Sequence, residues 1–146
     1  MKLRTIIVAA SAAVAIATAA PASAHEVGDK VTPNFEQAIP NIPGKSLVAL
    51  VVDYPPGGSS APHTHATSAF VYAYVISGQI ESMVNDGKAR IYKAGESWSE
   101  PPGSSHPVSR NVSRTRTAKL LAVFVADTDE KRLTTPVKSN PKGGKQ

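Results

Sequence analysis

Three of the four histidines lie in two short segments whose spacing suits a metal site. One residue separates His63 from His65, so on a β-strand, where side chains alternate, both rings point to the same face. Two neutral nitrogen donors then converge, as a borderline metal such as Zn, Mn, Fe, Ni or Cu requires. His106 follows a Pro-Pro-Gly turn at 101–103 and would add a third donor from a separate strand. Taken alone, this spacing favours surface or hydrogen-bonded histidines, because His-x-His pairs occur by chance in many proteins.

A carboxylate near such a metal could shuttle protons, and Glu100 is the best-placed acid for this catalytic role or for that of a fourth ligand. The alternative is a solvated acid at a strand end, since acidic side chains usually stay exposed. Other polar and aromatic residues could line a pocket or attract an anion, although core, interface or exposed positions are the more ordinary explanation. These residues are Ser68, Tyr72, Tyr74 and Trp98 for the pocket, and Arg110, Arg114 and Arg116 for the anion.

The segments that must position the histidines are short runs rich in Val, Ile, Tyr and Phe, separated by Gly, Pro and Asn-Asp turns. They cover residues 46–53, 69–76, 79–84, 88–93, 96–100, 106–110 and 119–126. Asn85-Asp86-Gly87 predicts a hairpin, because these residues tolerate the positive φ of tight turns. Helical periodicity is nearly absent, and the pattern predicts an antiparallel sandwich or small barrel over 46–137.

The two ends of the chain differ from this block. Residues 1–24 have a basic start, an apolar stretch and small residues at Ala22 and Ala24, which predicts a signal peptide cleaved after Ala24 and a secreted or periplasmic protein without a stable membrane anchor. An uncleaved anchor is the alternative, but the apolar stretch is shorter than the roughly 20 residues that span a bilayer. Residues 25–45 are interpreted as an extended arm along a sheet edge or a neighbouring subunit, and 138–146 as a disordered basic tail.

Composition excludes several kinds of chemistry. The chain has 146 residues, enough for one domain, and no cysteine, so disulfides, thiolate nucleophiles and Cys-ligated metal sites are ruled out. Five of the 16 Lys and Arg residues lie in 1–24 and 138–146, which leaves 11 cations against 11 acids between them. The body is therefore formally neutral, and no nucleic-acid partner is expected.

The two histidine segments together resemble the two signature motifs of the cupin superfamily. Gly57, His63, His65 and Gly78 fill the first motif, and Gly95, Pro101, Gly103 and His106 fill the second, with Asn111 one position late. The resemblance covers residues 46–126 and is greatest to small single-domain bacterial cupins. It implies an all-β cupin double-stranded β-helix, an antiparallel barrel of jelly-roll type, with a metal ion held by His63, His65 and His106.

One departure from the cupin pattern concerns the carboxylate ligand of the first motif. Phe70 or Val71 stands where the family has glutamate, and neither can ligate a metal. Three neutral imidazoles would leave the metal its full charge and an open position, which favours an anionic substrate or activated water. The lost carboxylate is equally compatible with abandoned metal binding.

The sequence therefore predicts an exported cupin with a mononuclear three-histidine site for a divalent metal of unknown identity (Fe, Mn, Zn, Ni or Cu). Its expected substrate is a small anionic or carbonyl-containing molecule, and the expected chemistry is dioxygenase-like, isomerase or hydrolase. Two alternatives stay open: a non-catalytic barrel that binds a small molecule or metal, and a scaffold that has lost its site. A homodimer formed through strand exchange or edge packing is the expected assembly.

Overall fold

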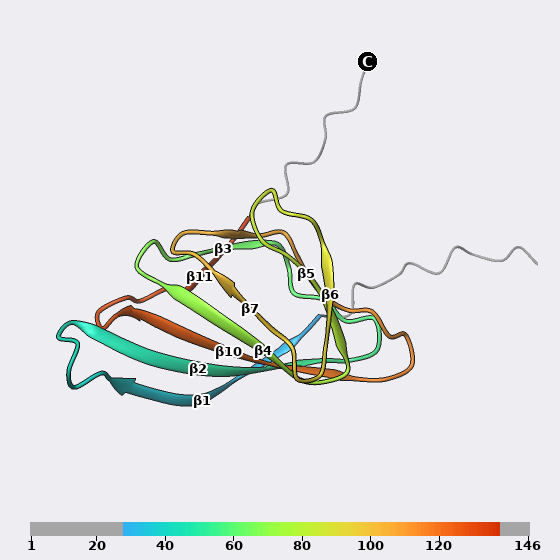
Figure 1. Ribbon diagram of the computed structural model, residues 1–146, viewed down its shortest axis with the longest axis horizontal. Helices are drawn as coiled ribbons and strands as arrows, with labels where there is room; N and C mark the ends of the chain where they lie inside the picture. The colour runs from blue at the N-terminus through green and yellow to red at the C-terminus, as the bar shows by residue number, and fades with distance from the viewer. Residues whose placement is uncertain (1–27, 138–146) are drawn as a thin grey trace, which may run out of the picture.

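The computed structural model describes residues 28–137, which form eleven β-strands and no helix (Figure 1). The strands are β1 (Lys30–Ala38), β2 (Lys45–Tyr54), β3 (His63–His65), β4 (Phe70–Ser77), β5 (Gln79–Met83), β6 (Arg90–Lys93), β7 (Ser97–Glu100), β8 (Ser105–His106), β9 (Val108–Asn111), β10 (Ala118–Asp127) and β11 (Thr134–Pro136). Within this part of the chain no helix is long and apolar enough to cross a membrane. The predicted signal peptide and basic tail lie outside the described residues.

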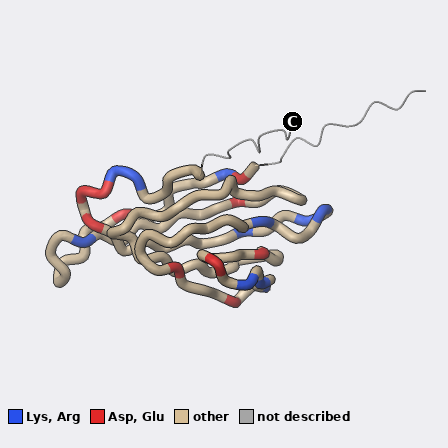
Figure 2. The backbone as a smooth tube through the Cα atoms, turned by 90° about the horizontal axis from the view of Figure 1, so that it is seen from above, with Lys and Arg blue, Asp and Glu red and all other residues tan. Residues whose placement is uncertain are grey.

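The strands form three antiparallel sheets that enclose one interior. A large sheet has the order β1-β2-β10-β4-β7, and two smaller sheets have the orders β11-β3-β8 and β6-β5-β9. In Figure 1 the large sheet lies below and the small sheets lie across it. This arrangement confirms the predicted all-β antiparallel barrel. Charged residues lie mainly in loops and near strand ends, which leaves the middle of the long strands largely without charged residues (Figure 2).

The alternation of side chains along the long strands builds the core. On β10 the residues that face the interior are buried, whereas their neighbours on the other face are only half-buried. The interior residues form two apolar clusters, one around Tyr54, Val75 and Ile80 and one around Val71 and Phe124. Both clusters consist largely of residues from the large sheet, so this sheet is one wall of the barrel.

Two tight turns join neighbouring strands. Asn85 has a φ of 51° and lies in the loop between β5 and β6, which pair antiparallel, so the predicted hairpin is confirmed. Gly78 has a φ of 76° between β4 and β5, and a Cβ there would lie 2.7 Å from the Cβ of Ala118. Only glycine fits this conformation and this close approach.

Part of the segment interpreted as an arm is a regular strand. Lys30–Ala38 is β1, which pairs with β2 as an edge strand of the large sheet, and all nine of its residues are exposed. The register shifts between Pro33 and Phe35, where the strand carries a bulge. The proposed boundary between arm and barrel at residues 45 and 46 stays a prediction.

Candidate metal centre

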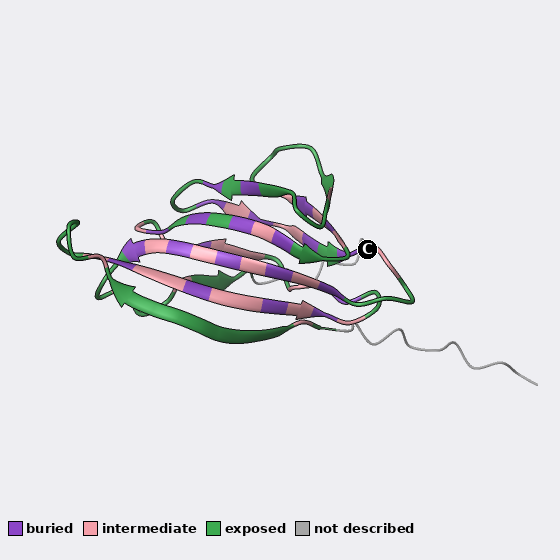
Figure 3. Ribbon diagram, turned by 60° about the horizontal axis from the view of Figure 1, so that its bottom comes forward, coloured by how far each residue is buried: buried purple, intermediate pink, exposed green. Residues whose placement is uncertain are grey.

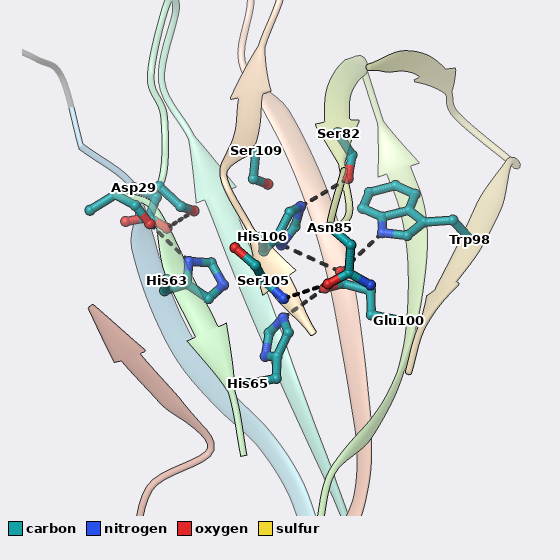
Figure 4. Close-up of polar contacts among 12 residues, drawn as sticks. Asp29, His63, His65, Ser82, Asn85, Trp98, Glu100, Ser105, His106 and Ser109 are labelled. Atoms are coloured by element: carbon teal, nitrogen blue, oxygen red, sulfur yellow. Dashed lines mark hydrogen bonds and ion pairs between the residues drawn. The ribbon is translucent and has the colours of Figure 1, made fainter. Parts of the chain in front are cut away.

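The three predicted ligand histidines come together on two paired strands. β3 carries His63 and His65, and β8 carries His106, which lies directly opposite His63 in the antiparallel register. One nitrogen from each ring can be chosen so that all three lie within 4.8 Å of one another. The close-up in Figure 4 shows the three rings around one space. A single metal ion could bind all three nitrogens after small ring rotations.

The turn before β8 fixes this pairing. The amide of Ser104 donates to the carbonyl of Pro101, and Gly103 takes the positive φ of 71° that the turn requires. The amide of His65 then donates to the carbonyl of Ser104 at 2.9 Å. The Pro-Pro-Gly turn therefore delivers His106 to the strand that carries the other two histidines.

Glu100, the predicted catalytic acid, lies against this cluster at the end of β7. Its side chain is 2% exposed, with Oε2 2.7 Å from Nε2 of His65 and Oε1 3.4 Å from Nδ1 of His106. The indole of Trp98 donates a hydrogen bond to Oε1 at 3.0 Å. The alternative of a solvated strand-end acid is wrong, because β7 pairs with β4 and places Glu100 opposite the buried Val71.

The remaining ring contacts decide which nitrogens are free. Nδ1 of His63 lies 2.8 Å from the carbonyl of Ala61, to which it donates, so its Nε2 is available as a ligand. Nε2 of His106 lies 2.9 Å from Oγ of Ser82, which leaves Nδ1 facing Glu100. Both nitrogens of His65 and Oε2 of Glu100 are buried without a hydrogen-bond partner, since their short contact is poorly aligned.

These unpartnered atoms fit a bound cation. Buried polar atoms without partners cost free energy, and a metal ion shared by nitrogen and carboxylate donors would satisfy them. Imidazoles with one carboxylate are a donor set that suits divalent Zn, Mn, Fe, Ni or Cu. The donors present therefore match the kind of metal that the sequence predicts.

Electrostatics prepare the donors for this role. Burial lowers the pKa of His63 and lowers the pKa of His106 to about 4, so both rings are neutral at pH 7. Burial by itself would raise the pKa of Glu100, but its contacts with His65, His106 and Trp98 outweigh burial and hold that pKa below its ordinary value. The site thus offers neutral imidazole nitrogens beside an ionised carboxylate.

A cavity of about 260 Å³ opens beside the cluster. Leu50, Val71, Ala73, Ala122 and Phe124 form much of its apolar wall. Its other polar side chains belong largely to one hydrogen-bonded chain, in which the buried Tyr54 hydroxyl contacts Ser109 at 2.7 Å and Ser60 at 2.9 Å, and Ser60 donates to Asp29. Among the described residues that line it there is no lysine or arginine.

The other residues singled out from the sequence lie away from the cavity. Tyr72 and Tyr74 point from β4 to the opposite face of the sheet, because Val71 and Ala73 take the inner positions. Ser68 donates to Glu130, and Trp98 lies outside the cavity lining, where it donates to Glu100 and has its ring centre 6.4 Å from that of His106. The pocket-lining hypothesis is therefore wrong for the two tyrosines, since a strand's period of two sends them outward.

Two polar residues have structural roles. Arg110 pairs with Glu81 on the surface. Asn111, one position late in the second motif, is buried and donates to the carbonyls of Pro55 and Arg116 at 3.1 and 2.7 Å. It stabilises the loop before β10.

Sequence reasoning missed Ser82, Tyr54 and Asp29 at this site. They come from β5, from the end of β2 and from the segment before β1. Only the register of distant strands brings Ser82 to His106, and Tyr54 and Asp29 to the cavity. Tyr54 closes an apolar alternating run, which is the one local sign that it is buried.

Comparisons with known proteins agree with this fold. The family model described as the cupin domain matches residues 50–124. Similar solved structures include a cupin domain of Cnp3 from Schizosaccharomyces pombe, with a TM-score of 0.56 and 22% identity over 68% of this chain and 62% of that one. An oxalate oxidase in complex with the substrate analogue glycolate has a TM-score of 0.55 and 26% identity over 70% and 53%.

A conserved protein with a double-stranded β-helix domain from Klebsiella pneumoniae has a TM-score of 0.57 and 21% identity over 75% of this chain and 84% of that one. The chain thus spans 62% and 53% of the length of the Cnp3 domain and the oxalate oxidase. No match was found among curated proteins.

Proposed function

Because the chain belongs to the cupin domain family, whose model matches residues 50–124, we propose that His63, His65 and His106 hold one divalent metal ion for chemistry on a small molecule. The observation that carries this proposal is the convergence of three imidazoles within 4.8 Å beside a buried, ionised Glu100. Glu100 either completes the ligand set or holds the ring of His65 in place through its carboxylate.

The bound metal would supply Lewis-acid or redox chemistry at an open position facing the cavity. The chain's own residues define what reaches that position. The wall formed by Leu50, Ala73 and Ala122 excludes water, while the hydroxyls of Tyr54 and Ser60 offer hydrogen bonds to a polar group of the substrate. Glu100 Oε2, which has no hydrogen-bond partner, can accept a proton from a bound molecule.

The substrate class follows from the charges around the cavity. No lysine or arginine among the described residues lines the cavity. The metal centre itself would therefore have to bind an anionic group of the substrate. A small molecule with one carboxylate or carbonyl and an apolar remainder fits this lining. The similarity to an oxalate oxidase in complex with glycolate supports a small carboxylate and an oxidative reaction, with dioxygenase-like, isomerase or hydrolase chemistry as the other options.

A second function, non-catalytic binding of a metal or small ligand, is favoured by one observation. The two positions where the first cupin motif would carry its carboxylate ligand are Phe70, which is exposed, and Val71, which is buried in the wall. Glu100 is then the only carboxylate of the described residues in contact with the cluster.

Metal content of purified protein tests the site. We expect one equivalent of metal in the wild type and in His25→Ala, the control for the fourth histidine, and large losses in His63→Ala, His65→Ala and His106→Ala. Equal metal in all variants would refute the ligand assignment. Oxygen consumption then distinguishes the two proposed functions. It is measured with iron- or manganese-loaded protein and small carboxylates, diketones and phenols. Turnover supports an enzyme, and no turnover supports non-catalytic binding.

We also propose that the protein is exported and that residues 1–24 are removed. The basic start, the apolar stretch and the small residues before Ala24 support this. N-terminal sequencing of the exported protein should begin at His25, and a start at Met1 would refute the proposal.

A further inference from the structure

Asp29 gives the cavity a polar group at its rim, apart from the histidine cluster. It precedes β1, is half-buried and lines the cavity, and Figure 4 shows it next to His63. Val31, two residues further along, also lines the cavity and is 50% exposed. All of β1 is exposed, whereas β2 and β10 consist largely of buried and half-buried residues (Figure 3). Asp29 and Val31 thus belong to a solvent-accessible rim of the cavity.

A chain of hydroxyl groups holds the Asp29 carboxylate in place. Ser60 donates a hydrogen bond to Asp29. The Ser60 hydroxyl lies 2.9 Å from that of the buried Tyr54, which lies 2.7 Å from the hydroxyl of Ser109. The amide of Ser60 also donates to the carbonyl of Ser109 at 2.9 Å, so the backbone of this segment is fixed as well. A carboxylate anchored in this way is already in position for a ligand, which lowers the entropy cost of binding.

The charge of Asp29 has no counterpart among residues 28–137. The ion pairs formed within this range do not include Asp29, and Ser60 is the one side chain of the range that bonds to it. A surface carboxylate needs no partner while water solvates it. This carboxylate, however, faces a cavity from which a ligand displaces water. An apolar group placed over it would leave a charge that is both desolvated and uncompensated, which costs free energy.

The histidine cluster and the rim attract groups of opposite charge. The three imidazoles are neutral, so a divalent cation beside the ionised Glu100 would leave one net positive charge at the cluster, two from the cation less one from Glu100. That charge attracts a carboxylate. Asp29 attracts a cation instead and repels a second carboxylate. The rest of the lining is largely apolar, with Leu50 and Ala122 among its residues, and suits a short hydrocarbon chain.

We propose that Asp29 binds a protonated amine, and that the ligand of this cavity is a small amino acid whose carboxylate and ammonium groups lie at opposite ends of a short chain. This inference rests on the proposed function, because it leaves the carboxylate of the ligand to the metal centre. It narrows the substrate class from small carboxylates in general to those that also carry a cation. A dicarboxylate would bring its second carboxylate against Asp29 and is therefore disfavoured.

Calorimetric titration of the zinc-loaded protein tests the role of the amine, because zinc has no redox chemistry and binding is then measured without oxidative turnover. β-Alanine, butyrate and succinate share the same chain and end in an ammonium, a methyl and a carboxylate group. γ-Aminobutyrate, valerate and glutarate extend this series by one carbon. For at least one chain length, we expect the amine to bind about tenfold more tightly than its methyl counterpart, as a hydrogen bond to a charged group allows, and the dicarboxylate to bind most weakly.

Asp29→Asn tests the residue, since it removes the charge and keeps the size of the side chain. We expect this variant to lose the preference for the amine while it binds the methyl-terminated acid as the wild type does. Asp129→Asn is the matched control, because Asp129 is exposed in the loop after β10, does not line the cavity and should leave the preference unchanged. Circular dichroism checks the fold of both variants. If Asp29→Asn failed to fold, the comparison of end groups in the wild type would still decide.

Three results would overturn the inference. The methyl-terminated acids could bind the wild type as tightly as the amines do, neither amine could bind at all, or the preference for the amine could survive Asp29→Asn. Metal content tests the proposed function separately, because Asp29 is not one of the three proposed ligands and Asp29→Asn should keep the metal content of the wild type. A wild type without metal refutes the proposed function, whereas a metal-bound wild type without preference for the amine refutes this inference alone.

Discussion

The carboxylate of Glu100 lies 2.7 Å from the ring of His65, and both side chains are almost completely buried, at 2% and 3% exposure. An ionised carboxylate is stable there only with compensating charge or hydrogen bonds. Glu100→Gln keeps the shape of the side chain and removes its charge. We expect a 10- to 100-fold loss of metal affinity, which is typical when an outer partner of a ligating histidine is changed, measured by competition with a chromophoric chelator.

Glu36→Gln is the matched control, because Glu36 is exposed on β1, away from the cluster, and should leave the affinity unchanged. If Glu100→Gln bound metal as tightly as the wild type, Glu100 would have no part in holding the ion.

Acid should destabilise the metal-free protein. Burial lowers the pKa of His106 from 6.5 to about 4. Between pH 6.5 and pH 4, His106 therefore binds a proton in the unfolded chain but stays neutral in the folded chain. The contribution of the neutral His106 ring to the free energy of unfolding is complete above pH 6.5 and falls as the pH drops towards 4. His106 alone should lower the free energy of unfolding by about 2 kcal/mol between pH 7 and pH 5.

His63 acts in the same direction, since burial lowers its pKa too. The depressed pKa of Glu100 gives stability that is present above its ordinary value of 4.5 and is lost below it. Urea titrations of the metal-free protein at pH 7, 6 and 5 measure the sum of these contributions to the free energy of unfolding. A free energy of unfolding that stays flat or rises towards pH 5 would contradict the expectation.

Tyr54→Phe tests the hydroxyl chain along the cavity. The buried hydroxyl bonds to both Ser109 and Ser60, so its removal leaves two serine hydroxyls short of a partner. We expect a loss of about 1–2 kcal/mol in the free energy of unfolding, measured by urea titration. Tyr92→Phe is the control: Tyr92 stacks on Trp98 with ring centres 4.5 Å apart and has no hydroxyl bond among the described contacts. Equal losses would show that packing accounts for the effect.

The histidine cluster could be predicted from the sequence because its geometry is local. A period of two fixes His63 relative to His65, and a turn of three residues delivers His106. The apolar runs likewise predicted β4, β5 and β10 to within a few residues, since their alternation reflects burial of one face.

Burial of Glu100 could not be predicted in the same way. It depends on β7 pairing with β4, which sets Glu100 opposite Val71, and no local pattern encodes this register. The orientation of Tyr72 could not be predicted either. An aromatic residue beside a motif could face the pocket or the other side of the sheet, and the alternation of side chains along β4 decides between the two. β1 escaped assignment as a strand because Pro33 interrupts its alternation and all its side chains are exposed.

A pair of glycines separates backbone strain from steric clash. Gly78 and Gly95 have φ values of 76° and 90°, so alanine at either position adopts a conformation that costs about 1–2 kcal/mol. A Cβ at Gly95 meets nothing within 4 Å, whereas at Gly78 it would lie 2.9 Å from both Cα of Ala118 and the carbonyl oxygen of Thr117. Ala118 is the first residue of β10 and Thr117 directly precedes it, so these backbone atoms cannot move without disturbing the pairing of β10 with β2.

Gly78→Ala should therefore cost at least about 2 kcal/mol more than Gly95→Ala, because the clash adds to the strain. Urea titration of both variants measures the difference. A loss at Gly78 no larger than at Gly95 would mean that the start of β10 yields to the added methyl group, and that the close approach of these two segments does not fix the end of the barrel.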